Sequence, residues 1–292
     1  MKKFVIDANK NTKLSLFVYQ NFPQISYHTF QKILRKKDVY VNRQRIGKDL
    51  QIKKGDFVEI YCPDSLVKYF FVVYEDENIM VVNKAFGIIV AEKDKTRVGE
   101  VSLQELLEKQ FRKKFFPLHR IDMNTSGLVI FCKSPKVLNE MKNIMKKHQV
   151  SKIYFAEVVG KYNLPPKLHK AFLVKDSVRR SVKIFKEKTL PQAMEIETFV
   201  ECIQVKEKTS VVKVEITNGK THQIRAHMAF LGFALVGDNK YGQKSTNKKF
   251  GTRKQKLLAQ KLVFKTTEKK YEYLNNINIE VPDSDVKTFF EK

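Results

Sequence analysis

Two stretches in the second half of the chain alternate apolar and polar side chains with a period of two. The alternating positions are Met194, Ile196, Thr198, Val200 and Cys202 in the first stretch and Val212, Val214 and Ile216 in the second. Because successive side chains of a strand point to opposite faces, this period predicts half-exposed β-strands. Strands with one exposed face are typical of antiparallel sheets, which limits the fold more than any other feature.

Other apolar patterns complete this larger part of the chain. Short apolar runs at residues 79–82 and 128–132 predict buried strands. One helix face is marked by Val137, Met141, Ile144 and Met145. Because strands and helices alternate without the regular rhythm of βαβ units, the sequence predicts an α+β domain over residues 70–292. We expect a large, mostly antiparallel mixed sheet with flanking helices and loops.

Residues 1–62 are predicted to form a separate small α/β domain. Apolar spacing indicates one short helix around Leu14 and a second around Phe30, for which Ser26 is a plausible N-cap. Short strands follow, and residues 63–69 are the predicted linker. The basic side chains on the second helix and the turn after it are Lys32, Arg35, Lys36, Lys37, Arg43 and Arg45. Such a basic face is expected to contact a polyanionic partner.

The chain carries 56 Lys and Arg against 31 Asp and Glu, a formal net charge of +25. Residues 1–62 hold 13 Lys plus Arg and 5 Asp plus Glu, which gives +8 and leaves +17 for the remainder. Such an excess indicates a polyanionic partner, and nucleic acid comes first because neutralising phosphates releases counterions. A solubilising surface in a Lys-biased protein is the alternative explanation.

Cys62, Cys132 and Cys202 lie far apart and match no metal-binding spacing, so they are expected to be free thiols in a reducing compartment. The N-terminus reaches Asp7 before any long apolar run and does not resemble a signal peptide. No stretch approaches the roughly 18 apolar residues that a membrane span needs. We therefore expect a cytoplasmic protein without membrane association, and a monomer, since no pattern suggests an extended interface.

Three segments interrupt apolar patterns with polar side chains. Residues 117–127, PLHRIDMNTSG, gather His, Arg and Asp before a buried strand, although a turn needs only one or two polar residues. Residues 218–227, NGKTHQIRAH, begin with an Asn-Gly turn and continue as a helix that Thr221 could cap. Residues 151–160, SKIYFAEVVG, predict a strand in which Tyr154, taken alone, is best explained by core packing. The first segment in particular indicates a site.

Arg225 lies beside the apolar stripe of the helix predicted after the Asn-Gly turn. Because an unpaired charge there would be costly, Arg225 should have an acidic partner, if only in a structural ion pair. His222 and His227 lack the spacing of a helical zinc motif and are interpreted as surface or hydrogen-bonded residues. No metal site is predicted.

Together these segments resemble the RluA-type pseudouridine synthases. The run from His119 to Gly127 is similar to the family signature HRLDxxTSG, and the other two segments resemble its K-x-Y strand and its G-R/K-T-H-Q-I-R-x-H helix. Residues 236–242, VGDNKYG, are similar to its GDxxYG segment, and residues 73–84 resemble its opening strand. Order and spacing agree over about residues 70–265. Residues 12–61 resemble the RNA-binding domain named after ribosomal protein S-four.

Carried over by position, the resemblance implies a role for each residue. Asp122 would be the catalytic aspartate, with Arg225 as its ion-pair partner, and Tyr154 would pack on the target base. Arg120 resembles the arginine that holds the place or phosphate of the extruded nucleotide, and His119 is assigned to RNA contact beside it. The ion pair with Arg225 should keep Asp122 ionised when RNA covers it.

The implied reaction isomerises uridine in RNA by breaking the carbon–nitrogen glycosidic bond and re-forming the link at carbon-5. A carboxylate nucleophile can hold an intermediate while the base turns, and the target must leave the helical stack to be reached. Attack on the sugar, attack on the base, and a glycal route begun by proton abstraction all remain open. No metal or organic cofactor is required.

Large-subunit ribosomal RNA is the favoured substrate, because the N-terminal module could anchor on RNA shape away from the reacting base. Transfer RNA is the alternative. From another class of function, a non-catalytic RNA-binding or ribosome-assembly protein could keep this fold, but such a protein would not need Asp122, Tyr154 and Arg225 together. No pattern supports a DNA-binding protein or a metal-dependent nuclease.

Overall fold

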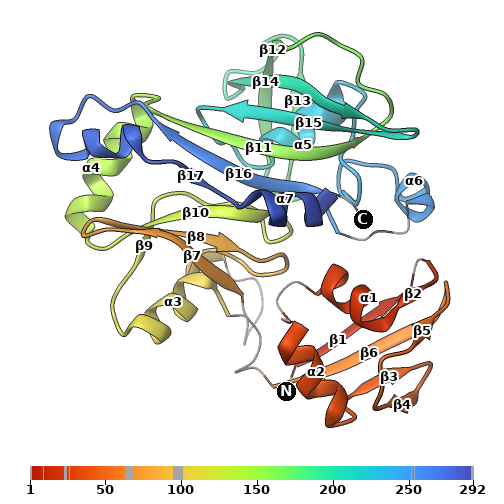
Figure 1. The fold of residues 1–292 in the computed structure, drawn as a ribbon. Helices are drawn as coiled ribbons and strands as arrows, with labels where there is room; N and C mark the ends of the chain where they lie inside the picture. Colours follow the sequence, from red (N-terminus) through yellow and green to blue (C-terminus); the bar gives the residue numbers. More distant parts are fainter. Residues whose placement is uncertain are drawn as a thin grey trace. The chain divides into compact units, whose positions relative to one another are not determined.

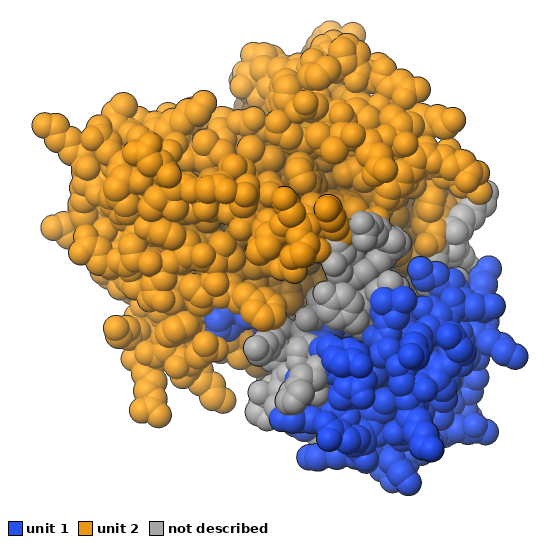
Figure 2. All heavy atoms as spheres, in the orientation of Figure 1, with its two compact units in different colours: residues 1–70, 291–292 blue, residues 71–290 orange. Residues whose placement is uncertain are grey.

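The computed structural model describes residues 2–8, 10–22, 25, 27–63, 69–94, 101–250, 252 and 254–290. The chain divides into two compact units, residues 1–70 and residues 71–290, which Figure 2 colours separately. Most of the predicted linker, residues 64–68, lies outside the described residues, as does the predicted N-cap Ser26.

In the first unit, the helices α1 and α2 pack on an antiparallel sheet whose described strands have the order β1-β6-β3-β4 (Figure 1). The elements are β1 (Lys2–Asp7), β2 (Thr12–Lys13), α1 (Leu14–Asn21), α2 (Tyr27–Arg35), β3 (Val39–Val41), β4 (Gln44–Ile46), β5 (Gln51–Ile52) and β6 (Phe57–Cys62). The two predicted helices are confirmed, and Phe17, Phe30 and Ile33 are buried against Val39 and Val58. Strand β1 was missed by the prediction and pairs along the whole of β6.

In the second unit, the described strands form one sheet of eleven, with the order β13-β12-β14-β15-β11-β16-β10-β8-β7 and with β17 beside β16 and β9 beside β10. The strands are β7 (Phe70–Glu75), β8 (Ile79–Lys84), β9 (Phe116–Pro117), β10 (Ser126–Cys132), β11 (Val150–Val159), β12 (Lys167–Asp176), β13 (Ser181–Phe185), β14 (Met194–Val205), β15 (Thr209–Ile216), β16 (Leu257–Phe264) and β17 (Ile279–Glu280). Among the described strand pairings, all are antiparallel except that of β10 with β16. The predicted α+β class and the mostly antiparallel sheet are confirmed.

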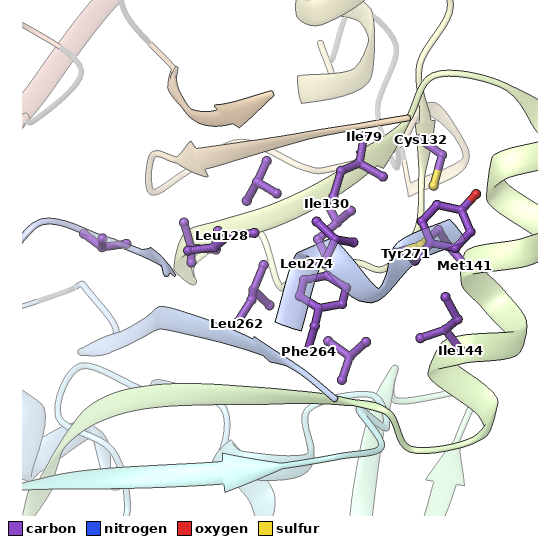
Figure 3. Close-up of a cluster of buried hydrophobic side chains, with 14 of the residues drawn as sticks. Ile79, Leu128, Ile130, Cys132, Met141, Ile144, Leu262, Phe264, Tyr271 and Leu274 are labelled. Atoms are coloured by element: carbon purple, nitrogen blue, oxygen red, sulfur yellow. The ribbon is translucent and has the colours of Figure 1, made fainter. Parts of the chain in front are cut away.

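Helices flank this sheet (Figure 1). They are η2 (Glu92–Asp94), α3 (Leu103–Phe111), α4 (Pro135–Lys146), α5 (Gln223–Phe230), α6 (Lys244–Lys249), η3 (Lys269–Asn276) and α7 (Asp283–Phe290). The predicted apolar face of α4 is confirmed, because Met141 and Ile144 are fully buried against β10, β16 and η3 (Figure 3). None of the helices in the described part of the chain is both long and apolar enough to cross a membrane.

The parallel pairing of β10 with β16 brings two distant loops to one place. Gly127 of β10 has φ 111°, and a Cβ there would lie 2.2 Å from the carbonyl oxygen of Ala259 in β16. Gly237 has φ 78°, and a Cβ there would lie 2.0 Å from the carbonyl oxygen of Lys254. Only glycine fits positions with a left-handed φ and such close backbone approach. These two glycines therefore let the start of β10 and the segment after α5 both pack closely on residues 254–259.

Candidate active site

Asp122 lies in the loop that leads into β10, in a turn closed by the bond from the Thr125 amide to the Asp122 carbonyl (3.0 Å). The buried Gln255 side chain donates to the Thr125 hydroxyl (3.0 Å) and ties this turn to the residues before β16. The Asp122 carboxylate is 27% exposed. The loop is thus held by backbone and side-chain bonds while its carboxylate stays accessible.

Lys84, at the end of β8, holds the same loop by hydrogen bonds to its backbone. Its ammonium is fully buried and donates to the carbonyl oxygens of Ala85 (2.9 Å), Ile88 (2.9 Å) and Met123 (3.1 Å). Burial lowers the pKa of Lys84 to about 7, although the negative charge of Asp122 opposes the shift. Because Met123 follows Asp122, these bonds fix the backbone that carries the carboxylate.

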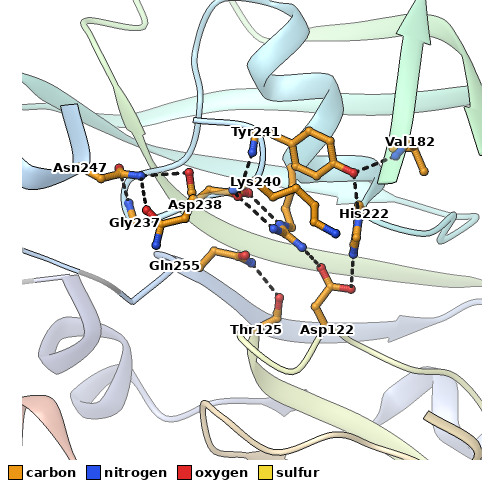
Figure 4. Close-up of polar contacts among 12 residues, drawn as sticks. Asp122, Thr125, Val182, His222, Gly237, Asp238, Lys240, Tyr241, Asn247 and Gln255 are labelled. Atoms are coloured by element: carbon orange, nitrogen blue, oxygen red, sulfur yellow. Dashed lines mark hydrogen bonds and ion pairs between the residues drawn. The ribbon is translucent and has the colours of Figure 1, made fainter. Parts of the chain in front are cut away.

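Arg225 of α5 makes the ion pair that the sequence predicted. Its Nη1 lies 2.7 Å from Oδ2 of Asp122, and its Nε and Nη2 bond both oxygens of Asp238 at 2.7 and 2.9 Å (Figure 4). Burial disfavours the guanidinium charge, but the bonds and charges of Asp238 and Asp122 outweigh it and raise the pKa of Arg225. One buried guanidinium therefore joins two carboxylates.

Asp238 is the more tightly held of the two carboxylates that Arg225 bonds. Its side chain is 1% exposed, and its Oδ1 also accepts from the backbone amides of Lys240 (2.9 Å) and Tyr241 (3.2 Å). Asn247 of α6 holds the segment by bonding the Gly237 amide and the Asp238 carbonyl, both at 2.9 Å. Although burial opposes ionisation, the Arg225 guanidinium and then the amides of Lys240 and Tyr241 keep the pKa of Asp238 below its ordinary value. The GDxxYG-like segment was recognised in the sequence, but no role for Asp238 was predicted.

A second chain of contacts reaches the other oxygen of Asp122. The Val182 amide donates to the Tyr241 hydroxyl (3.0 Å), which lies 2.8 Å from Nδ1 of His222 (Figure 4). Nε2 of His222 faces Oδ1 of Asp122 at 3.8 Å. The prediction that Thr221 caps α5 is wrong, because the N-cap is His222, with a left-handed φ of 52° and no side-chain capping bond. A non-glycine residue in that region is uncommon and marks a position held by its surroundings.

Asp122, His222 and Arg225 line a cleft of about 930 Å³ in the second unit, together with residues from β11 and the loops around it. Tyr154 is 6% exposed and borders the cleft, where burial and then the charge of Asp122 raise the pKa of its hydroxyl. Lys152 donates to the Thr217 carbonyl (2.7 Å), and burial lowers its pKa to about 8. Lys152 was not among the predicted site residues, although it stands in the recognised K-x-Y segment.

The two residues before Ile121 have different environments. His119 borders the cleft, and its Nε2 accepts a bond from the Ile130 amide (3.3 Å). Burial, and then the charge of Lys152, lowers the pKa of His119 to about 3, so the ring is neutral. Arg120 is 51% exposed and forms an ion pair with Asp94 of η2 at the edge of the cleft.

His227 was interpreted as a surface or hydrogen-bonded residue, and the structure corrects this in part. It is 1% exposed, and its Nδ1 lies 3.0 Å from the Thr198 hydroxyl. Its Nε2 is buried and has no hydrogen-bond partner among the described residues. Burial, and then His169, lowers the pKa of His227 to about 4. Within the described ranges, no group of three His, Cys, Asp or Glu side chains could hold a metal ion.

The predicted basic face belongs to the first unit. Its members are exposed on α2, on the turn that follows α2 and on the β3–β4 hairpin: Lys32, Arg35, Lys36, Lys37, Arg43 and Arg45. Nε of Arg45 donates to the Lys37 carbonyl (2.9 Å), and its guanidinium lies over the Tyr40 ring at 5.6 Å. The bond joins the turn after α2 to the hairpin. The six exposed basic side chains are called the α2–hairpin face below.

Comparison with known proteins identifies the family. Residues 78–230 match the RNA pseudouridylate synthase family. An uncharacterized RNA pseudouridine synthase of Mycoplasma genitalium is 30% identical over 99% of this chain and 97% of its own length. The ribosomal large subunit pseudouridine synthase C of Vibrio parahaemolyticus is 26% identical over 80% of this chain and 77% of its own length. The structure of human RNA pseudouridylate synthase domain containing 1 shares the fold, with TM-score 0.60, 21% identity and coverage of 76% of this chain and 86% of that one.

The chain therefore belongs to the RNA pseudouridylate synthase family, and the predicted resemblance to the RluA type is confirmed. It is an isomerase that modifies RNA by converting uridine to pseudouridine.

Proposed function

We propose that Asp122 is the catalytic carboxylate of this pseudouridine synthase and that Arg225 is its positioning partner. The observation that carries the proposal is the 2.7 Å bond from Arg225 to Oδ2 of a carboxylate that borders the cleft, while the nearest partner of Oδ1 among the described residues is Nε2 of His222 at 3.8 Å. Two carboxylates share the guanidinium, but only Asp122 is accessible, since Asp238 is 1% exposed. An accessible carboxylate with one oxygen held and one free suits either nucleophilic attack or proton abstraction.

Tyr154 is proposed as the surface on which the extruded uracil packs. Its ring borders the cleft beside Asp122, and burial raises the pKa of its hydroxyl further above neutral pH, so the ring carries no charge. For Arg120 we propose contact with an RNA phosphate at the edge of the cleft, where its exposed guanidinium would exchange Asp94 for the phosphate. His119, being neutral, would contact the nucleotide through its ring rather than by charge.

We further propose large-subunit ribosomal RNA as the substrate, held in part by the α2–hairpin face of a small RNA-binding domain like that of ribosomal protein S-four. Two observations support this: the exposed basic side chains of that face, and the similarity to a Vibrio enzyme named for the large ribosomal subunit. Both the RNA substrate and the cysteines, which form no disulfide among the described residues, suit a protein of the cytoplasm.

The test of the substrate uses transcripts of large-subunit ribosomal RNA and of transfer RNA, each labelled with tritium at carbon-5 of uracil. Pseudouridine formation expels that hydrogen, so we expect tritium release from the ribosomal transcript in proportion to the enzyme added. Release from transfer RNA alone would contradict the proposed substrate while leaving Asp122 in its role. Binding to both RNAs without release from either would favour the non-catalytic alternative.

A further inference from the structure

The two oxygens of Asp122 have different surroundings, and the difference bears on which one reacts. Oδ2 accepts the short bond from Arg225. Within the part of the chain that the structure describes, no hydrogen bond reaches Oδ1, and the group that faces it is Nε2 of His222 at 3.8 Å. We propose, on the basis of the function assigned to Asp122, that Oδ1 is the reacting oxygen. His222 is then the positioning residue that holds a neutral N–H donor beside it.

Tyr241 determines which nitrogen of His222 carries the proton. The Tyr241 oxygen accepts from the Val182 amide, so its single hydroxyl proton is free to point at Nδ1 of His222, 2.8 Å away. An imidazole whose Nδ1 accepts carries its proton on Nε2. The opposite tautomer would direct the Nε2 lone pair at a carboxylate oxygen and leave the hydroxyl proton without its acceptor. The geometry therefore favours an N–H directed at Oδ1.

The groups around His222 keep it neutral. Burial is the largest effect and lowers the pKa of the imidazole below its ordinary value. Asp122 and Asp238 act in the opposite sense, whereas Arg225 and Lys240 assist burial. A neutral donor can orient Oδ1 without forming an ion pair with it. An imidazolium would neutralise the carboxylate and compete with the substrate.

The backbone of His222 shows that its surroundings determine its position. The residue has φ 52° and ψ 20°, and its ring meets Tyr241 edge-on, with centroids 5.6 Å apart. The Tyr241 ring also lies 5.3 Å from the guanidinium of Arg225. Tyr241 therefore contacts the residues on both sides of Asp122, and the β13 edge strand is tied to the site through Val182. A donor held in this way needs a shift of about 1 Å to reach hydrogen-bonding distance of Oδ1.

The test compares two replacements that separate the donor from the backbone. In His222→Gln the side-chain amide nitrogen reaches the place of Nε2. In His222→Asn the amide reaches only the place of Nδ1, although Asn tolerates the left-handed backbone better. We expect His222→Asn to lower the single-turnover rate of tritium release about 10- to 100-fold, the cost of a carboxylate misplaced by about 1 Å. His222→Gln should lose less than about threefold, and RNA affinity should be unchanged in both.

A pH profile provides the second readout. In Tyr241→Phe, Nδ1 loses its donor and the imidazole protonates more readily, so the acid limb of the rate profile should move up by at least about half a pH unit. In the doubly substituted His222→Gln, Tyr241→Phe protein the shift should vanish, which a loss of folding would not reproduce.

The inference is overturned if His222→Asn retains the wild-type rate, or if Asn restores activity where Gln does not, since the role would then be that of the backbone. An unmoved acid limb in Tyr241→Phe also contradicts it. Absence of release from the wild type would overturn the proposed function of Asp122 and the inference with it. Active wild type with insensitive His222 variants would overturn the inference alone.

Discussion

The Asp122 cleft and the α2–hairpin face both carry positive charge, but the charge has a different environment in each. In the cleft, the Arg225 side chain is 9% exposed and bonds two carboxylates at 2.7–2.9 Å. On the α2–hairpin face, Lys32, Lys36 and Arg43 are exposed to solvent. Buried ion pairs give fixed geometry because breaking them leaves an uncompensated charge, whereas exposed charges give affinity that salt weakens. The cleft is therefore suited to positioning the Asp122 carboxylate, and the α2–hairpin face to attracting a polyanion.

The largest expected effect comes from removing the cation of the cleft. Arg225→Met leaves Asp238 buried without its counter-ion, and we expect a loss of about 3–5 kcal/mol in the free energy of unfolding. Urea unfolding followed by circular dichroism measures it. The matched control, Arg225→Met with Asp238→Asn, should recover much of the loss. A loss below about 1 kcal/mol in the single variant would show that the pair does not stabilise the site.

An intermediate effect concerns pH. Because the pKa of His227 is lowered to about 4 in the folded chain, the unfolded chain binds this proton first as the pH falls below about 6.5. Stability contributed by neutral His227 is thus present at pH 7 and lost on acidification, by about 1–2 kcal/mol at pH 5. His227→Asn, which keeps a polar group near Thr198, should lose less between pH 7 and pH 5 in the same unfolding assay. Equal losses would remove His227 from this role.

The smallest effect on stability is expected on the α2–hairpin face. Replacing Lys32, Arg35 and Lys36 together by Gln should change the free energy of unfolding by less than about 0.5 kcal/mol. The same change should flatten the dependence of RNA affinity on salt, by about 0.7–0.9 in the logarithmic slope for each phosphate that the face no longer neutralises. Filter binding at several salt concentrations measures this.

The control for that experiment is an equal loss of charge elsewhere in the first unit. Lys10, Lys48 and Lys54 are exposed and lie outside the α2–hairpin face. Their replacement by Gln should leave the slope nearly unchanged. Equal slopes for the two triple variants would mean that the first unit contributes only diffuse charge.

The predictability of the structure differs between these regions as well. The period of two in β14 and β15 predicted the sheet, because one face of each strand is buried and the other is not. Strand β1 was missed, since Lys2, Lys3 and Asp7 obscure its pattern and only pairing with β6 reveals it. The local sequence pattern was enough to predict strands whose burial alternates. It did not reveal β1, whose assignment depends on pairing with the distant strand β6.

Within the site, the partner of Arg225 was predicted but its second partner was not. The apolar stripe of the helix indicates that Arg225 needs an acidic partner. The two bonds from its guanidinium to Asp238 depend instead on tertiary structure, because the segment that carries Asp238 packs at Gly237 against the Lys254 backbone. His222 was interpreted as a surface or hydrogen-bonded residue, and its bond to Tyr241 agrees with that, but its place beside Asp122 was not predicted. A left-handed residue at the start of α5 has no sequence pattern of its own, and its partner Tyr241 comes from another loop.

The central claim is that Asp122 carries out the reaction while Arg225 and Asp238 only hold it. The most direct measurement is single-turnover tritium release from carbon-5-labelled RNA by the wild type and by Asp122→Asn, an isosteric change that keeps an oxygen for Arg225. The account predicts a loss of at least about a thousandfold with the dissociation constant for RNA unchanged within about twofold. A rate for Asp122→Asn within about tenfold of the wild type would contradict it.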